Sequence, residues 1–214
     1  MPVCTLPETE PRPKRPPVLN LPNLLTISRL GLAVVLFVLL AAEWLNTGLV
    51  LFIVAASTDW LDGYVARRRG ETTTLGRILD PFVDKVIVIG AFIFLLPIAG
   101  SAVTAWMVTV VVARELLVTG LRSYLEGESV AFGADWFGKI KMVVQCVAIC
   151  VVLFYLGVLR SSLAADWHVW GSPPDQWGAV LRTVSVWAAV VITALSGINY
   201  AWRAARLIRE REWG

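Results

Sequence analysis

The stretch Ser57–Lys85, STDWLDGYVARRRGETTTLGRILDPFVDK, decides the fold because it joins two apolar segments through a dense group of charges. Four aspartates lie against or inside those segments, and they are Asp59, Asp62, Asp80 and Asp84. Ionisable side chains are costly within a segment that crosses a membrane, and by default they indicate a function. Whether the segments do cross a membrane depends on the composition of the rest of the chain.

The composition is that of an integral membrane protein. The chain has 214 residues, of which 57% are hydrophobic and 16% charged, and its mean hydropathy is +0.69. A soluble domain is about 45–50% apolar and about 25% charged. At roughly 20 apolar residues per span, the chain can supply about six helices and no second soluble domain. Disordered, collagen-like and nucleic-acid-binding proteins are excluded by the same figures.

Turn-forming and charged residues divide the chain into six apolar segments. They cover residues 24–43, 47–67, 79–98, 102–125, 138–159 and 178–204. We therefore predict an all-α integral membrane protein with six transmembrane helices. Residues 1–18, which are rich in proline, are expected to form a flexible cytoplasmic tail. Residues 19–214 then form the six-span domain.

The distribution of basic residues predicts the orientation. With the amino terminus inside, all of the 19 lysines and arginines except Arg160 and Arg182 fall on the cytoplasmic side. Both termini are thus expected in the cytoplasm, in a multi-pass protein of the cell membrane. The arginines within 203–211 are expected to contact anionic lipid headgroups.

Helical periodicity gathers the residues of the opening stretch onto two stripes. At about 100° per residue, spacings of three, four, seven and eight return to one helix face. The stripe on the second helix holds Asp59, Asp62, Gly63, Ala66 and Arg67. The stripe on the third helix holds Gly76, Asp80 and Asp84. If the two helices face each other, four carboxylates point toward one place.

Four carboxylates cannot share an apolar pocket without a cation, because each raises the pKa of the others and desolvation costs several kcal/mol per ion. An all-oxygen ligand set without His or Cys is typical of Mg²⁺ or Mn²⁺. Gly63 and Gly76 leave room for a ligand close to the backbone. The alternative is a tight helix pair with a structural network of the aspartates with Arg67 and Arg77.

The pattern D-x-x-D-G-x-x-A-R-x8-G-x3-D-x3-D resembles the signature of the CDP-alcohol phosphatidyltransferases, and every fixed position is present. The resemblance implies a homodimeric membrane enzyme that uses an alcohol to displace CMP from a CDP-linked lipid, with two divalent ions. It implies that Asp59, Asp62, Asp80 and Asp84 bind the metals and that Asp84 is also the catalytic base. It assigns the CDP-lipid site to Asp59, Gly63, Ala66, Arg67 and Gly76. Gly197 in the sixth segment is expected to let a neighbouring helix approach closely.

Three further segments resemble a subgroup of that family, the phosphatidylglycerophosphate synthases. They are Leu19–Arg29, Ala113–Leu125 and Gly138–Gln145. A cytoplasmic basic cluster in two of them would bind an anionic acceptor such as sn-glycerol 3-phosphate through its phosphate. The cluster consists of Arg114, Arg122, Lys139 and Lys141. The alternative is that these cations only set the orientation and contact anionic lipids.

The resemblance therefore implies transfer of the phosphatidyl group of CDP-diacylglycerol to glycerol 3-phosphate, giving phosphatidylglycerophosphate and CMP. A sister enzyme that uses inositol phosphate or another alcohol is the nearest alternative. A divalent-cation transporter could use the same carboxylates. Transport would need acidic residues along a path across the bilayer, whereas the four aspartates are all predicted on the cytoplasmic side.

Overall fold

The computed structural model describes residues 21–69, 74–127, 136–159 and 174–212. Within these ranges the chain forms six α-helices, one π-helical turn and no strand, so the all-α prediction is confirmed. The elements are α1 (Leu21–Ala41), α2 (Leu45–Arg69), α3 (Thr74–Leu95), α4 (Ala105–Gly127), α5 (Trp136–Phe154), η1 (Tyr155–Leu159) and α6 (Pro174–Glu212). The proposed tail, residues 1–18, lies outside the described residues.

Some helices extend well beyond the apolar segments that predicted them. Helix α3 begins at Thr74 rather than at 79, and α6 continues to Glu212 rather than to 204. At 1.5 Å per residue, the 39 residues of α6 span about 58 Å, far more than the ~30 Å hydrocarbon core of a bilayer. Apolarity marks the part of a helix that lipid can cover, and at the end of α6 arginine and glutamate residues, which have good helix propensity, carry the helix further.

Two of the described helices suit a membrane by both length and composition. Among the described residues, Trp136–Gly157 and Asp175–Glu210 are long and apolar enough to cross one. Shorter apolar segments occupy Ile27–Ala41, Leu45–Thr58 and Lys85–Leu95. Large apolar side chains also lie exposed on every helix, and they include Val38, Val50, Phe82, Leu116, Val143, Val180 and Ile198. So much exposed apolar surface is rare in a soluble monomer and indicates contact with lipid.

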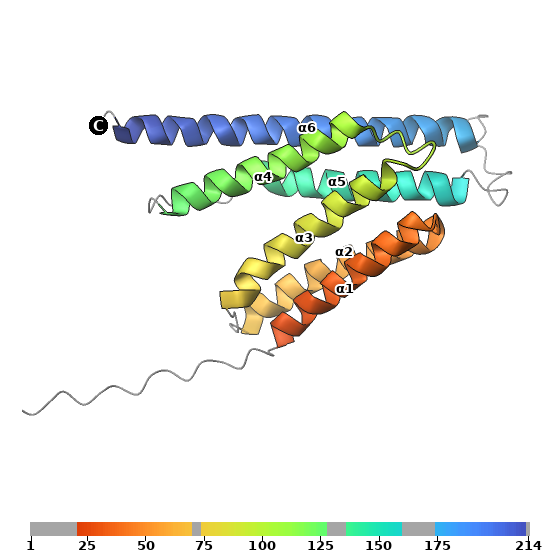
Figure 1. Ribbon diagram of the computed structural model, residues 1–214, viewed down its shortest axis with the longest axis horizontal. Helices are drawn as coiled ribbons and strands as arrows, with labels where there is room; N and C mark the ends of the chain where they lie inside the picture. Colours follow the sequence, from red (N-terminus) through yellow and green to blue (C-terminus); the bar gives the residue numbers. More distant parts are fainter. Residues whose placement is uncertain (1–20, 70–73, 128–135, 160–173, 213–214) are drawn as a thin grey trace, which may run out of the picture.

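Successive helices run in alternating directions along the bundle (Figure 1). Helix α6 lies along one side with α4 and α5 packed against it, while α1 packs against α2 and α3. Contacts of α2 with α5 and of α3 with α4 join the two groups. Helix α1 begins and α6 ends at the same end of the bundle, where α2 ends and α3 begins (Figure 1). This alternation gathers the residues of the opening stretch at one end.

Each helix contributes apolar side chains to one core. The most buried include Leu36, Phe52, Phe92, Val111, Ile149 and Val186, one from each of the six helices. Helix α1 ends in a Schellman motif, in which Glu43 adopts a positive φ of 57°. The Trp44 N–H donates to the Leu39 carbonyl at 2.9 Å. This short turn makes α1 and α2 antiparallel neighbours.

Helices α1 and α3 approach closely at Gly90. The Phe37 ring of α1 lies over Gly90 and stacks on Phe94 of α3, with ring centroids 5.1 Å apart. A Cβ atom on Gly90 would overlap the Phe37 ring. The missing side chain therefore sets the distance between the two helices.

We expect Gly90→Ala to lower the free energy of unfolding in mild detergent by about 1–3 kcal/mol, because overpacking displaces a ring that is stacked on its neighbour. The matched control is Gly31→Ala, since a Cβ atom there meets nothing within 4 Å. The control should unfold at or slightly above the wild-type temperature, because alanine favours the helix. Equal thermal stability of the two variants would contradict this role of Gly90.

Candidate functional site

The residues of the aspartate motif lie on two helices, as predicted. Asp59 and Asp62 fall in the last three turns of α2, and Asp80 and Asp84 fall in the first three turns of α3. The other motif positions lie on the same two helices, and they are Gly63, Ala66, Arg67 and Gly76. The side chains of all eight residues lie outside the described residues, so their convergence stays a prediction.

A metal site elsewhere finds no support in the side chains that the structure describes. Among them, no group of three or more His, Cys, Asp or Glu could hold a metal ion. The motif aspartates do not belong to that set. They stay the ligands predicted from the sequence, and the oxygen chemistry of their carboxylates fits Mg²⁺ or Mn²⁺.

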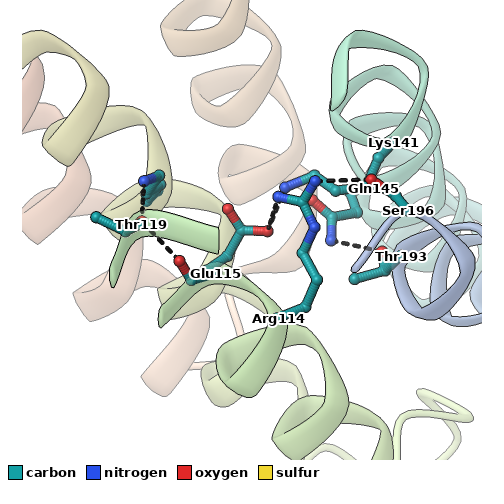
Figure 2. A network of polar contacts seen from close by, with 8 residues as sticks. Arg114, Glu115, Thr119, Lys141, Gln145, Thr193 and Ser196 are labelled. Atoms are coloured by element: carbon teal, nitrogen blue, oxygen red, sulfur yellow. Dashed lines mark hydrogen bonds and ion pairs between the residues drawn. The ribbon is translucent and has the colours of Figure 1, made fainter. Parts of the chain in front are cut away.

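A buried ionic network lies where α4, α5 and α6 meet (Figure 2). The Glu115 carboxylate on α4 accepts a hydrogen bond from Arg114 Nη1 at 3.1 Å. The same oxygen, Oε1, accepts a hydrogen bond from Lys141 Nζ on α5. All three side chains are at most 9% exposed. One carboxylate therefore serves as the counter-ion of two buried cations.

Helix α6 completes the network with neutral groups. Arg114 Nη2 donates to Ser196 Oγ at 2.7 Å, and Gln145 Nε2 of α5 donates to Thr193 Oγ1 at 2.9 Å (Figure 2). Gly197 makes this possible, because a Cβ atom there would lie 2.9 Å from Arg114 Cγ. The expected close approach at Gly197 is thus found within the chain, where it admits the stem of Arg114.

On the other side, the network reaches α3. Lys85 Nζ of α3 donates to Thr119 Oγ1 of α4 at 2.5 Å. The Thr119 hydroxyl in turn donates to the Glu115 carbonyl at 2.6 Å. Polar contacts therefore connect α3, α4, α5 and α6 in sequence.

The ionic part of the network carries more positive than negative charge. Arg114 and Lys141 contribute two positive charges against the single negative charge of Glu115. Arg114 Nε is also buried and makes no hydrogen bond to the described residues. A buried donor without an acceptor is unfavourable. The site is therefore suited to an anion, which would bring both acceptors and negative charge.

Of the four predicted acceptor-binding residues, the structure brings two together. Arg114 and Lys141 meet at Glu115, whereas Lys139 is exposed, with Nζ 5.9 Å from the centroid of the Trp136 ring. Lys139 and Lys141 are two residues apart, so they point about 200° apart around α5. Arg122 is exposed about two turns further along α4.

Sequence reasoning gave no role to several members of the network, which are Lys85, Glu115, Thr119, Gln145, Thr193 and Ser196. Glu115 and Gln145 did carry a signal, because a polar side chain within an apolar helix needs a partner. Gln145 also follows Lys141 by four residues and therefore lies on the same face of α5. Nothing in the sequence shows that the partners lie on α6.

The family model and the similar proteins all point to one family of enzymes. A family model described as CDP-alcohol phosphatidyltransferase matches residues 19–195. A Bacillus subtilis (strain 168) protein is 32% identical over 196 residues, which cover 85% of this chain and 93% of the relative. Proteins of Salmonella typhimurium (strain LT2) and Shigella flexneri are 34% and 33% identical, over 71% of this chain and 90% of each relative. All three relatives are named CDP-diacylglycerol--glycerol-3-phosphate 3-phosphatidyltransferase.

We expect Glu115→Gln to lower the free energy of unfolding by about 3–5 kcal/mol, because it leaves two buried cations without their counter-ion. Glu210→Gln is the matched control, since Glu210 pairs with Arg206 on the exposed surface of α6. An exposed pair of this kind contributes about 0.3–0.5 kcal/mol. Thermal unfolding of both variants in one detergent measures the difference. A Glu115→Gln protein as stable as the control would show that the ion pairs do not hold the helices together.

Proposed function

The chain belongs to the CDP-alcohol phosphatidyltransferase family, and we propose that it transfers the phosphatidyl group of CDP-diacylglycerol to sn-glycerol 3-phosphate. The products are phosphatidylglycerophosphate and CMP. The observation that carries the proposal is the complete aspartate motif on α2 and α3. The names of the relatives, which match over most of this chain, support glycerol 3-phosphate as the acceptor.

The proposed reaction is a single displacement at phosphorus. The acceptor hydroxyl oxygen attacks the phosphatidyl phosphorus and forms a new P–O bond. The P–O bond of the pyrophosphate breaks, and CMP leaves with its electron pair. The Asp84 carboxylate accepts the hydroxyl proton. The protein's main tasks are then to place the two substrates in line and to balance their charge.

Asp59, Asp62, Asp80 and Asp84 would hold two divalent ions, Mg²⁺ or Mn²⁺. Such ions would neutralise the charge that develops on the pyrophosphate. The small residues of the same stripes, Gly63, Ala66 and Gly76, would let the CDP group approach the helix backbones, and Arg67 would contact its phosphates.

The membrane arrangement follows from the substrate. We propose that all six helices cross the membrane with both termini in the cytoplasm, because the helices alternate in direction and the basic residues gather on one side. The acyl chains of the donor then stay in the bilayer while its cytidine reaches cytosolic water. A homodimer is proposed from the family resemblance alone, since Gly197 is occupied by Arg114 of the same chain.

Arg114 and Lys141 are proposed to bind the phosphate of the acceptor. Glu115 orients both cations, while Arg114 Nε and two Lys141 protons have no acceptor among the described residues. The phosphate would supply the missing acceptors and balance the excess positive charge. The exposed cations Arg122 and Lys139 would attract the anionic acceptor toward this site.

Two other functions can be compared with this one. A sister enzyme for inositol phosphate would need the same cationic site, and an acceptor assay distinguishes the two enzymes. A divalent-cation transporter fits less well, because the polar network beyond the aspartates is cationic and would repel the ion.

We expect activity to require a divalent cation and each of the four aspartates. Asp80→Asn keeps the shape of the side chain and removes its charge, so CMP release should fall by at least about 10²-fold. The control, Asp175→Asn at the exposed start of α6, should keep its activity. Full activity in EDTA, or in a folded Asp80→Asn protein, would contradict the metal site.

The acceptor is tested by CMP release from CDP-diacylglycerol with glycerol 3-phosphate, inositol 1-phosphate or glycerol. Glycerol should be a very poor substrate, because it lacks charge-assisted hydrogen bonds worth about 1.5–3 kcal/mol each. Arg114→Lys should raise the KM for glycerol 3-phosphate by about tenfold, since the planar donor fork is lost but the charge remains. Arg206→Lys on exposed α6 is the control. Turnover with inositol 1-phosphate alone would assign the sister activity, and equal turnover of glycerol would exclude a phosphate site.

A further inference from the structure

The contact between Lys85 and Thr119 joins the helix that bears Asp80 and Asp84 to the buried ionic network. We propose that Lys85 is a positioning residue, which fixes the aspartate-bearing turns of α3 relative to the acceptor site on α4. The inference rests on the proposed function, which assigns the aspartate motif on α2 and α3 to the CDP-lipid and the ionic network around Glu115 to the acceptor.

The contact lies on the exposed side of α4, where the Thr119 side chain is exposed. Lys85 is half-buried, and its Nζ lies 2.5 Å from Thr119 Oγ1. The Thr119 hydroxyl uses its own proton to bond the Glu115 carbonyl at 2.6 Å, which turns its lone pairs toward the lysine. Lys85 is thereby linked, through one hydroxyl, to the backbone of the residue that holds Arg114 and Lys141.

The position of Lys85 along α3 allows the contact to restrict the turns that carry the aspartates. Helices α3 and α4 lie close at one end of the bundle and diverge toward the end where α3 begins (Figure 1). Lys85 follows Asp84 directly and lies about 7.5 Å along the helix axis from Asp80. A long side chain that bridges the diverging helices at this level restricts rotation and tilt of the turns that carry both aspartates.

Such a restriction affects turnover more than binding. Residues of α4 position the acceptor hydroxyl, whereas α3 carries the proposed base and two of the proposed metal ligands. The hydroxyl must therefore meet groups that belong to another helix. A displacement of about 1 Å in a reacting group can reduce the rate about 10²-fold, even when both substrates still bind. Loss of the Lys85 contact should therefore lower kcat while the KM for each substrate changes little.

The test compares Lys85→Met, Lys85→Arg, Thr119→Val and the Lys85→Met/Thr119→Val double variant of the full chain in detergent. The matched control is Thr109→Val, because Thr109 on the same helix makes the same kind of hydroxyl bond, to the Ala105 carbonyl at 2.9 Å. Each protein is assayed for kcat, for the KM of glycerol 3-phosphate, for thermal unfolding, and for Mn²⁺ binding by electron paramagnetic resonance.

We expect Lys85→Met and Thr119→Val each to lower kcat by about tenfold, with the KM for glycerol 3-phosphate within about twofold of wild type. The double variant should be no slower than Lys85→Met, because both changes remove one interaction. Lys85→Arg should recover part of the rate, and Thr109→Val should match wild type. Mn²⁺ binding should stay within about twofold, since the metal-binding helices keep all their carboxylates.

Three results would overturn the inference. A raised KM with unchanged kcat would make Lys85 a direct ligand of the acceptor phosphate. Multiplying losses in the double variant would show that Lys85 acts without Thr119. Lower thermal stability with unchanged kcat would leave the contact a purely structural one. Failure of the proposed function is seen separately, as absence of CMP release by the wild-type protein with every acceptor.

Discussion

The burial of two cations beside one carboxylate is the constraint on which the packing of α4, α5 and α6 depends. Removing an ion from water costs several kcal/mol, so Arg114 and Lys141 can be buried only if Glu115 stays within reach of both. That requirement sets the distance between α4 and α5. On α6, Gly197 gives the arginine stem space and Ser196 gives it a second acceptor. The contacts of three helices thus follow from one charge balance.

Stability alone does not explain this arrangement. Apolar side chains of similar volume often replace a buried ion pair with no loss of stability. An apolar core would also leave no buried donor such as Arg114 Nε without an acceptor. The excess positive charge and the donor without an acceptor support the proposed anion site, in which Glu115 holds two cations in place.

The features predicted correctly from the sequence are local ones. Six apolar segments correspond to six helices, and the aspartate motif lies on α2 and α3, because composition and helical period depend on neighbouring residues. The ionic network depends on contacts such as Arg114 with Ser196, which are 82 residues apart. The charges of Lys139 and Lys141 could be counted, but the rotation of α5 that buries one and exposes the other is set by packing. The position of Glu115 within an apolar helix indicated that it needs a partner, but a single acidic residue does not reveal which residues those partners are.

The Thr119 hydroxyl explains how the aspartate motif and the cationic network can be connected while each keeps its own charge. Carboxylates on α2 and α3 suit divalent ions, whereas the cations on α4 and α5 suit an anionic acceptor, which free carboxylates would repel. A carboxylate at position 119 would hold Lys85 more strongly, but it would add negative charge beside the cations that we propose bind the acceptor. A hydroxyl is neutral and can donate to Glu115 while it accepts from Lys85. It therefore transmits position between α3 and α4 and leaves the charge of each region unchanged.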